Sequence, residues 1–184
     1  MAVNPTAARL VDKTTVAVLA SYALTTVHHI YGGIDDGVTS RLWLPVVIAP
    51  PTLVALAALR AYKRSGSARA LATGSSVIVL TWVLVSGVLH GAYSHVYKSL
   101  LYLLGGPAEA YFVLNPGEHY PPDDIFFEVT GSLETLTAAA SAVLVFRLVQ
   151  NWRRERRHLL PARPGGGSAR PLDGTRPGQD HTLG

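Results

Sequence analysis

Apolar residues collect in four blocks along the chain, and each block is long enough to form a helix that crosses a membrane. A hydrocarbon core of ~30 Å takes about 20 helical residues to cross. The blocks cover residues 14–34, 42–62, 70–92 and 125–150. Few charged side chains fall inside them: Arg60, Glu128, Glu134 and Arg147. The pattern predicts an all-α integral membrane protein built as a four-transmembrane-helix bundle.

Turn-forming residues separate the blocks and divide the chain into regions. Gly32 and Gly33 end the first block, and Gly105, Gly106 and Pro107 end the apolar stretch that continues beyond the third. The sequence leaves open whether residues 93–104 prolong the third helix or lie along the interface. The predicted regions are a lead over 1–13, a transmembrane domain over 14–152 with an outer loop over 93–124, and a tail over 153–184.

Basic residues are distributed unequally between the two sides of this predicted bundle. One side holds nine: Arg9, Lys13, Lys63, Arg64, Arg69, Arg153, Arg154, Arg156 and Arg157. The loops on the other side hold Arg41 and Lys98. Because short cytoplasmic segments carry an excess of Lys and Arg, we expect both termini to be cytoplasmic. We also expect a multi-pass protein of the plasma membrane.

Composition narrows the chemistry further. The chain has no cysteine, which excludes disulfides and thiolate metal ligands. Topology and contact with anionic lipids account for the formal net charge of +4, so the bilayer is the expected partner and nucleic acid is not. From Pro161 onward the basic tail is rich in Gly, Pro and Arg, and we expect it to be mostly disordered. Nothing in the sequence predicts an oligomeric state.

The same topology places histidines and carboxylates together on the outer side of the membrane. Ionisable groups in a membrane segment are costly unless they find partners, and they usually mark a functional site. Ser21, Thr25 and His28 follow helical spacing and should share one inward face. The candidate metal ligands are His28, His29, His90, His95, His119 and Glu128. The candidate catalytic groups are Glu128 and Glu134, with Glu134 about 9 Å deeper along its helix.

Imidazole and carboxylate together suit a zinc or iron ion. We therefore expect a small multi-pass membrane protein that binds a non-haem transition metal near the non-cytoplasmic face and acts on a lipid-soluble small molecule. The sequence contains no HExxH motif or multi-histidine box, so these ligands rest on topology alone. His95 follows His90 by five residues and would point elsewhere on a continuous α-helix.

Two alternatives remain open at this stage, and so does the question of whether the protein is an enzyme. In the first, a histidine of the first span and His90 hold a b-type haem in a membrane electron-transfer protein, which suits a four-helix bundle. In the second, the acids and histidines handle protons or cations in a transporter or in a non-enzymatic accessory subunit.

Overall fold

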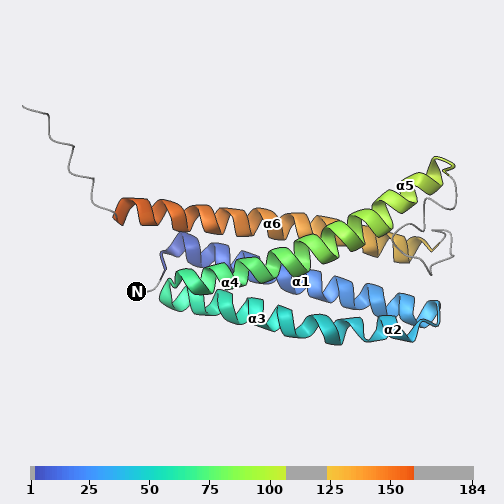
Figure 1. Cartoon of the computed structure of the whole chain (residues 1–184), viewed down its shortest axis with the longest axis horizontal. Coiled ribbons are helices and arrows are strands. Elements are labelled where there is room, and N and C mark those ends of the chain that lie inside the picture. Colours follow the sequence, from blue (N-terminus) through green and yellow to red (C-terminus); the bar gives the residue numbers. More distant parts are fainter. Residues whose placement is uncertain (1–2, 107–123, 160–184) are drawn as a thin grey trace, which may run out of the picture.

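The computed structural model describes residues 3–106 and 124–159, and the regular structure in these ranges is helical. The long helices form rods that lie side by side (Figure 1). The first is α1, and α2 is a short turn that leads into the second, α3. The third rod is continuous and consists of α4, a π-helical segment (η1) and α5, and the fourth is α6. Their bounds are α1 Pro5–Asp35, α2 Thr39–Leu42, α3 Leu44–Ser65, α4 Ala68–Ile78, η1 Val79–Tyr97, α5 Lys98–Leu103 and α6 Ile125–Leu159.

Local sequence explains where the rods begin and end. The side chain of Asn4 accepts a hydrogen bond of 2.7 Å from the backbone N–H of Ala7, directly before the proline that opens α1. Gly66 ends α3 in the left-handed conformation, with φ of 66°. At the start of α6, the Asp124 carboxylate accepts from the N–H of Phe127 at 3.0 Å. Residues 93–104, which the sequence left open, continue the third rod to Leu103.

Three of the rods are long and apolar enough to cross a membrane: Thr39–Ser65, Ala68–Leu103 and Ile125–Arg157. The sequence predicted four such spans. Although α1 has 31 residues, it is not among these three, and its sequence contains charged, hydroxyl and imidazole side chains. Composition therefore supports three spans directly, and a membrane-crossing α1 belongs to the proposal below.

Several polar side chains of α1 turn inward while several of its aliphatic ones turn outward. Thr14, Ser21, Thr25 and His28 are buried, whereas Val16, Val27 and Ile34 are exposed. Polar groups turn inward in this way when the surroundings are lipid, where they would find no hydrogen-bond partners.

The interior of the bundle changes character along its length. Toward the N-terminal end of α1 the core is aliphatic and aromatic, with Leu59, Tyr62, Ile78 and Leu148 fully buried. Toward the other end the buried side chains are polar or charged: Thr25, His28, His29, Ser86, His95, Lys98, Glu128, Thr130 and Glu134. The apolar half holds the bundle together, and the polar half contains the candidate site.

Small residues let η1 and α6 approach each other closely beside this polar half. A Cβ atom added at Gly87 would lie 2.1 Å from the Cβ of Ala138, and one at Gly91 would lie 2.7 Å from the hydroxyl of Thr135. Small residues at membrane helix interfaces permit this approach. The close packing brings the histidines of η1 onto the carboxylates of α6.

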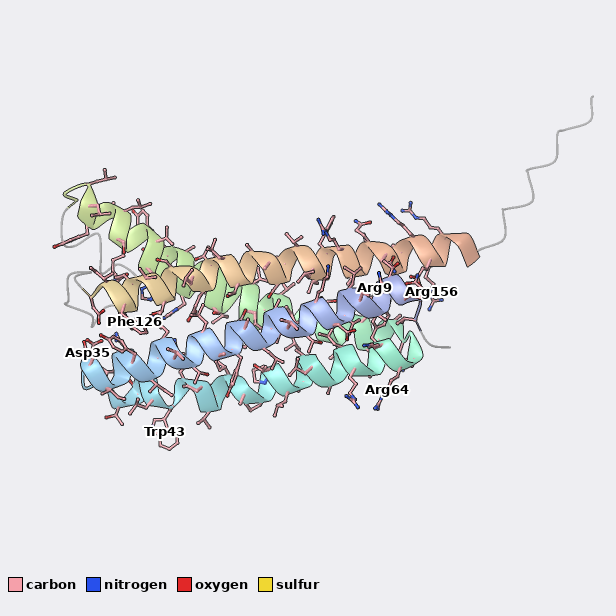
Figure 2. The ribbon with its side chains drawn as sticks, turned by 180° about the vertical axis from the view of Figure 1, so that it is seen from behind. Arg9, Asp35, Trp43, Arg64, Phe126 and Arg156 are labelled. Atoms are coloured by element: carbon pink, nitrogen blue, oxygen red, sulfur yellow. The ribbon has the colours of Figure 1, made fainter. Side chains whose placement is uncertain are left out.

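The two ends of the bundle differ in charge. The N-terminal end of α1, the turn between α3 and α4, and the C-terminal end of α6 lie together (Figure 1). Arg9, Arg64 and Arg156 lie at this end, while Asp35, Trp43 and Phe126 lie toward the other (Figure 2). The polar half of the interior therefore lies at the end of the bundle opposite Arg9, Arg64 and Arg156.

Candidate metal centre

Four histidine rings meet between α1 and η1 at the polar end of the bundle. His28 and His29 come from α1, and His90 and His95 come from η1. The ring centroids of His28 and His95 are 4.7 Å apart, those of His29 and His90 are 4.7 Å apart, and those of His90 and His95 are 4.8 Å apart. The cluster therefore forms a continuous group of imidazoles.

Three of these histidines can hold a metal ion. His28, His29 and His90 each offer one ligand atom, and the three atoms lie within 4.8 Å of one another. Ligands bound to zinc at about 2.0–2.1 Å lie within roughly 4 Å of each other. Side-chain movements of less than about 1 Å would therefore close the three nitrogens around one ion.

The tautomer of His28 follows from its hydrogen-bond partner. Its Nδ1 lies 2.9 Å from the hydroxyl of Thr130, which donates its own proton to the carbonyl of Phe126 at 2.8 Å. A hydroxyl has a single proton to donate, so His28 Nδ1–H is the donor and Nε2 carries the lone pair. That Nε2 atom is buried without a hydrogen-bond partner, as a metal ligand would be before it binds.

His90 is oriented by a buried carboxylate. Its Nδ1 lies 3.2 Å from Glu134 Oε2, which also accepts from the Ser86 hydroxyl at 2.7 Å. An ionised carboxylate only accepts, so Nδ1–H of His90 donates and its Nε2 is left for a ligand. A carboxylate bonded to the far nitrogen of a metal-bound histidine fixes the ring and makes it more basic.

Two further buried atoms lack partners in this cluster. His29 Nδ1 and Glu134 Oε1 are both buried without a hydrogen bond, and Glu134 is only 1% exposed. An unsatisfied buried polar group costs about 1–3 kcal/mol, so several in one place point to a missing partner. A metal ion with a bound water would satisfy the imidazole nitrogens and offer a proton to Glu134 Oε1.

The fourth histidine is held by an ion pair at the edge of the cluster. Nδ1 of His95 lies 3.0 Å from Glu128 Oε2, and the Lys98 ammonium lies 2.7 Å from Glu128 Oε1. The hydroxyl of Ser99 donates to the same carboxylate at 3.1 Å. All four of these side chains are buried or half-buried. Lys98 neutralises the carboxylate, which in turn fixes the imidazole of His95.

The π-helix explains why His95 joins the cluster, which α-helical spacing did not predict. In a π-helix each hydrogen bond spans five residues, so residues five apart come onto the same face. His90 and His95 are such a pair. The hydroxyl of Ser94 likewise donates to the carbonyl of Leu89, five residues back, at 3.2 Å. π-helical turns occur frequently at functional sites.

The structure brings most of the sequence-predicted residues together, in two groups. His28, His29 and His90 form the possible ligand triplet, with Glu134 bonded to His90. His95 and Glu128 form a neighbouring pair, so Glu128 contacts an imidazole and lies outside the triplet. His119 lies outside the described residues.

Sequence reasoning missed Thr130 and Lys98 as members of the site. Lys98 was assigned to an outer loop, and its burial follows from the continuation of the third rod into α5. Ser86 lies four residues before His90, so helical spacing places the two on one polar stripe, and the Ser86 hydroxyl donates to Glu134. Thr130 gave no signal, since threonine is common in such segments.

Aromatic and cationic groups close the site on its α6 side. The ring of Phe127 stacks on His28 with centroids 4.1 Å apart, and the guanidinium of Arg41 lies 4.9 Å from the centroid of Phe127.

No family model, no curated protein and no solved structure matches the chain. The chemistry of the site must therefore be inferred from the residues themselves.

Proposed function

We propose that this protein is a multi-pass membrane metalloprotein that binds one non-haem zinc or iron ion through His28, His29 and His90. The observation that carries the proposal is that these three imidazoles offer ligand atoms within 4.8 Å of one another. His28 Nε2 and His29 Nδ1 are also buried without hydrogen-bond partners. The Nδ1 atoms of His28 and His90 are bonded to Thr130 and Glu134. This is the arrangement of ligands with supporting outer contacts that metal sites use.

Three protein ligands leave an open coordination position, which is the feature of metal sites that carry out reactions. Glu134 has one oxygen bonded to His90 and Ser86 and the other without a partner. In our proposal its free oxygen accepts a proton from a water or substrate held at the open position, while its bonded oxygen keeps His90 in place. The protein would then be an enzyme in which Glu134 acts as the general base.

The membrane arrangement is part of the same proposal. We place α1 in the bilayer as a fourth span because its exposed face is apolar and its polar face is buried. The basic end of the bundle would face the cytoplasm with both termini, by the positive-inside rule. The histidine cluster then lies near the outer face of the plasma membrane, where a lipid-soluble substrate reaches it laterally.

The packing of the rings favours a non-haem ion over haem. A b-type haem would need two imidazoles facing each other across a porphyrin. In the structure His28 and His90 are in direct T-shaped contact, with centroids 5.0 Å apart and planes at 81°. His29 and His90 are also in contact, at 4.7 Å. This arrangement offers no slot for a planar macrocycle between the two helices.

A second function is supported by the continuity of the polar network. Thr25 and Ser86 lie 3.4 Å apart, Ser86 donates to Glu134, and Glu134 bonds His90. His95 contacts His90 and is bonded to Glu128. Chains of this kind move protons in membrane proteins, so a proton-handling transporter or accessory subunit is the competing proposal.

Elemental analysis and a visible absorption spectrum of the purified protein would distinguish these proposals. We expect about one zinc or iron per chain and no haem band. His90→Ala should abolish metal binding while leaving the helices formed. Glu134→Gln should weaken affinity by about 10–100-fold, as loss of an outer-shell partner does.

His158→Ala, which removes a histidine from the last turn of α6 at the opposite end of the bundle, is the matched control and should retain the metal. A protein that binds neither zinc nor iron when these are supplied would contradict the proposal. A haem band in the absorption spectrum would instead favour a b-type haem held by two histidines.

A further inference from the structure

A groove runs along the bundle surface between the end of η1 with α5 and the first turns of α6. It encloses about 640 Å³, within the range of ligand sites, about 300–1,000 Å³. Figure 1 shows α5 diverging from α6 at this end of the bundle. The groove adjoins the histidine cluster, because Glu128 lines it and is bonded to His95.

The groove faces hydrocarbon. Both of its walls belong to rods that are apolar enough to cross a membrane. Its rim is aliphatic and exposed, with Leu103 and Ile125 each 78% exposed and Leu136 64% exposed. An exposed apolar surface of this kind on a membrane span contacts lipid chains, so the occupant should have a long aliphatic portion.

Glu128, the one carboxylate among the described residues that line the groove, limits the headgroup. The charge of Glu128 is already paired with Lys98 at 2.7 Å. Because Lys98 and Glu128 together are neutral, the pair carries no net charge to attract a cationic or an anionic headgroup. An ionised carboxylate offers about four acceptor positions, and Lys98, His95 and Ser99 use three. The remaining position suits an uncharged donor such as a hydroxyl.

We propose that this groove binds a long-chain aliphatic alcohol, with its hydroxyl at Glu128 and its chain along Val129, Leu133 and Leu136. Leu136 lies about 12 Å along α6 from Glu128, which gives an aliphatic chain room to extend. The hydroxyl then lies one side chain, His95, from the metal-ligand triplet. That this alcohol is the substrate class of the metal site rests on the proposed function. Its binding in the groove requires no metal.

Photoaffinity labelling tests the proposal. The full-length protein in lipid nanodiscs is exposed to a long-chain alcohol that carries a diazirine in its chain, and the adducts are mapped by mass spectrometry. We expect adducts on the peptides of α5 and of the first turns of α6, and competition by unlabelled alcohol. Matched probes with the same chain and a carboxylate or trimethylammonium headgroup should label these peptides at least tenfold less.

A groove-filling variant provides the structural control. Ser132 is half-buried and lines the groove, so Ser132→Phe should reduce labelling about tenfold. Val143→Phe adds similar bulk at an exposed position of α6 beyond the groove and should leave labelling unchanged. If Ser132→Phe fails to fold, Leu136→Trp serves the same purpose from the rim. The double variant Glu128→Gln with Lys98→Met should remove the preference for the alcohol without leaving a buried charge unpaired.

The outcomes separate this inference from the proposed function, because metal content is measured on the same samples. Absent groove labelling, or equal labelling of Ser132→Phe and Val143→Phe, overturns the lipid site and leaves the metal proposal standing. Groove labelling in a protein that binds no metal overturns only the metal proposal. Crosslinked dimers without lipid adducts would show that a second copy of the chain occupies the groove, and would also overturn the inference.

Discussion

Replacing Gly131 with alanine should disturb the histidine cluster from outside it. The imidazole of His95 lies directly on this glycine: an added Cβ atom would be 2.3 Å from its Cγ and Cδ2 and 2.5 Å from its Nε2. Ordinary contacts of this kind are 3.4–4 Å, so the ring must move by about 1 Å. Because His95 is 2% exposed and packs on His28 and His90, it has little free space to move into.

The cost can be worked out from the contacts that would be lost. Overpacking a tight interior costs about 1–3 kcal/mol, and weakening the hydrogen bond between His95 and Glu128 costs a similar amount, about 1.5–3 kcal/mol. Alanine in place of glycine in a helix gains about 1 kcal/mol in return. We therefore expect a net loss of about 1.5–5 kcal/mol in the free energy of unfolding. We also expect metal affinity to fall about tenfold, as it does when outer-shell contacts are disturbed.

Denaturant-induced unfolding in detergent and competition with a chromophoric chelator would measure the two effects. Gly74→Ala is the matched control, since an added Cβ there meets the Cβ of Ala58 at 3.3 Å and otherwise ordinary contacts. Gly74→Ala should leave the free energy of unfolding equal or slightly higher, and the metal affinity should not change. If Gly131→Ala matched Gly74→Ala in both measurements, the close packing of His95 on α6 would be refuted.

Two other predictions follow from the ion pair and the topology. Lys98→Met leaves Glu128 as a buried, unpaired carboxylate and should lower the free energy of unfolding by about 3–5 kcal/mol. The double variant with Glu128→Gln should recover most of that loss in the same unfolding assay, and an unaffected single variant would contradict the buried pair. Because the chain has no cysteine, Ser40→Cys and Ser65→Cys test orientation by labelling of intact cells. A membrane-impermeant reagent should label position 40 and leave position 65 protected, and the reverse pattern would invert the topology.

The sequence by itself determined the helices and much of their orientation within the bundle. Blocks of about 20 apolar residues predict helices because only hydrogen-bonded helices and barrels satisfy the backbone in lipid. Helical spacing predicted that Ser21, Thr25 and His28 share an inward face, and all three are buried. The placement of His28, His29 and His90 at one level followed from the order of the spans, and the structure brings their ligand atoms together.

The tertiary structure decided the finer arrangement. His95 joins the cluster because η1 is a π-helix, a departure from α-helical spacing that no residue of that stretch signals on its own. Glu128 pairs with Lys98 and His95 because η1 packs on α6 and the third rod continues past η1 into α5, which begins at Lys98. Thr130 fixes the tautomer of His28 from a different helix. These contacts depend on the distance and rotation between helices, which local periodicity does not determine.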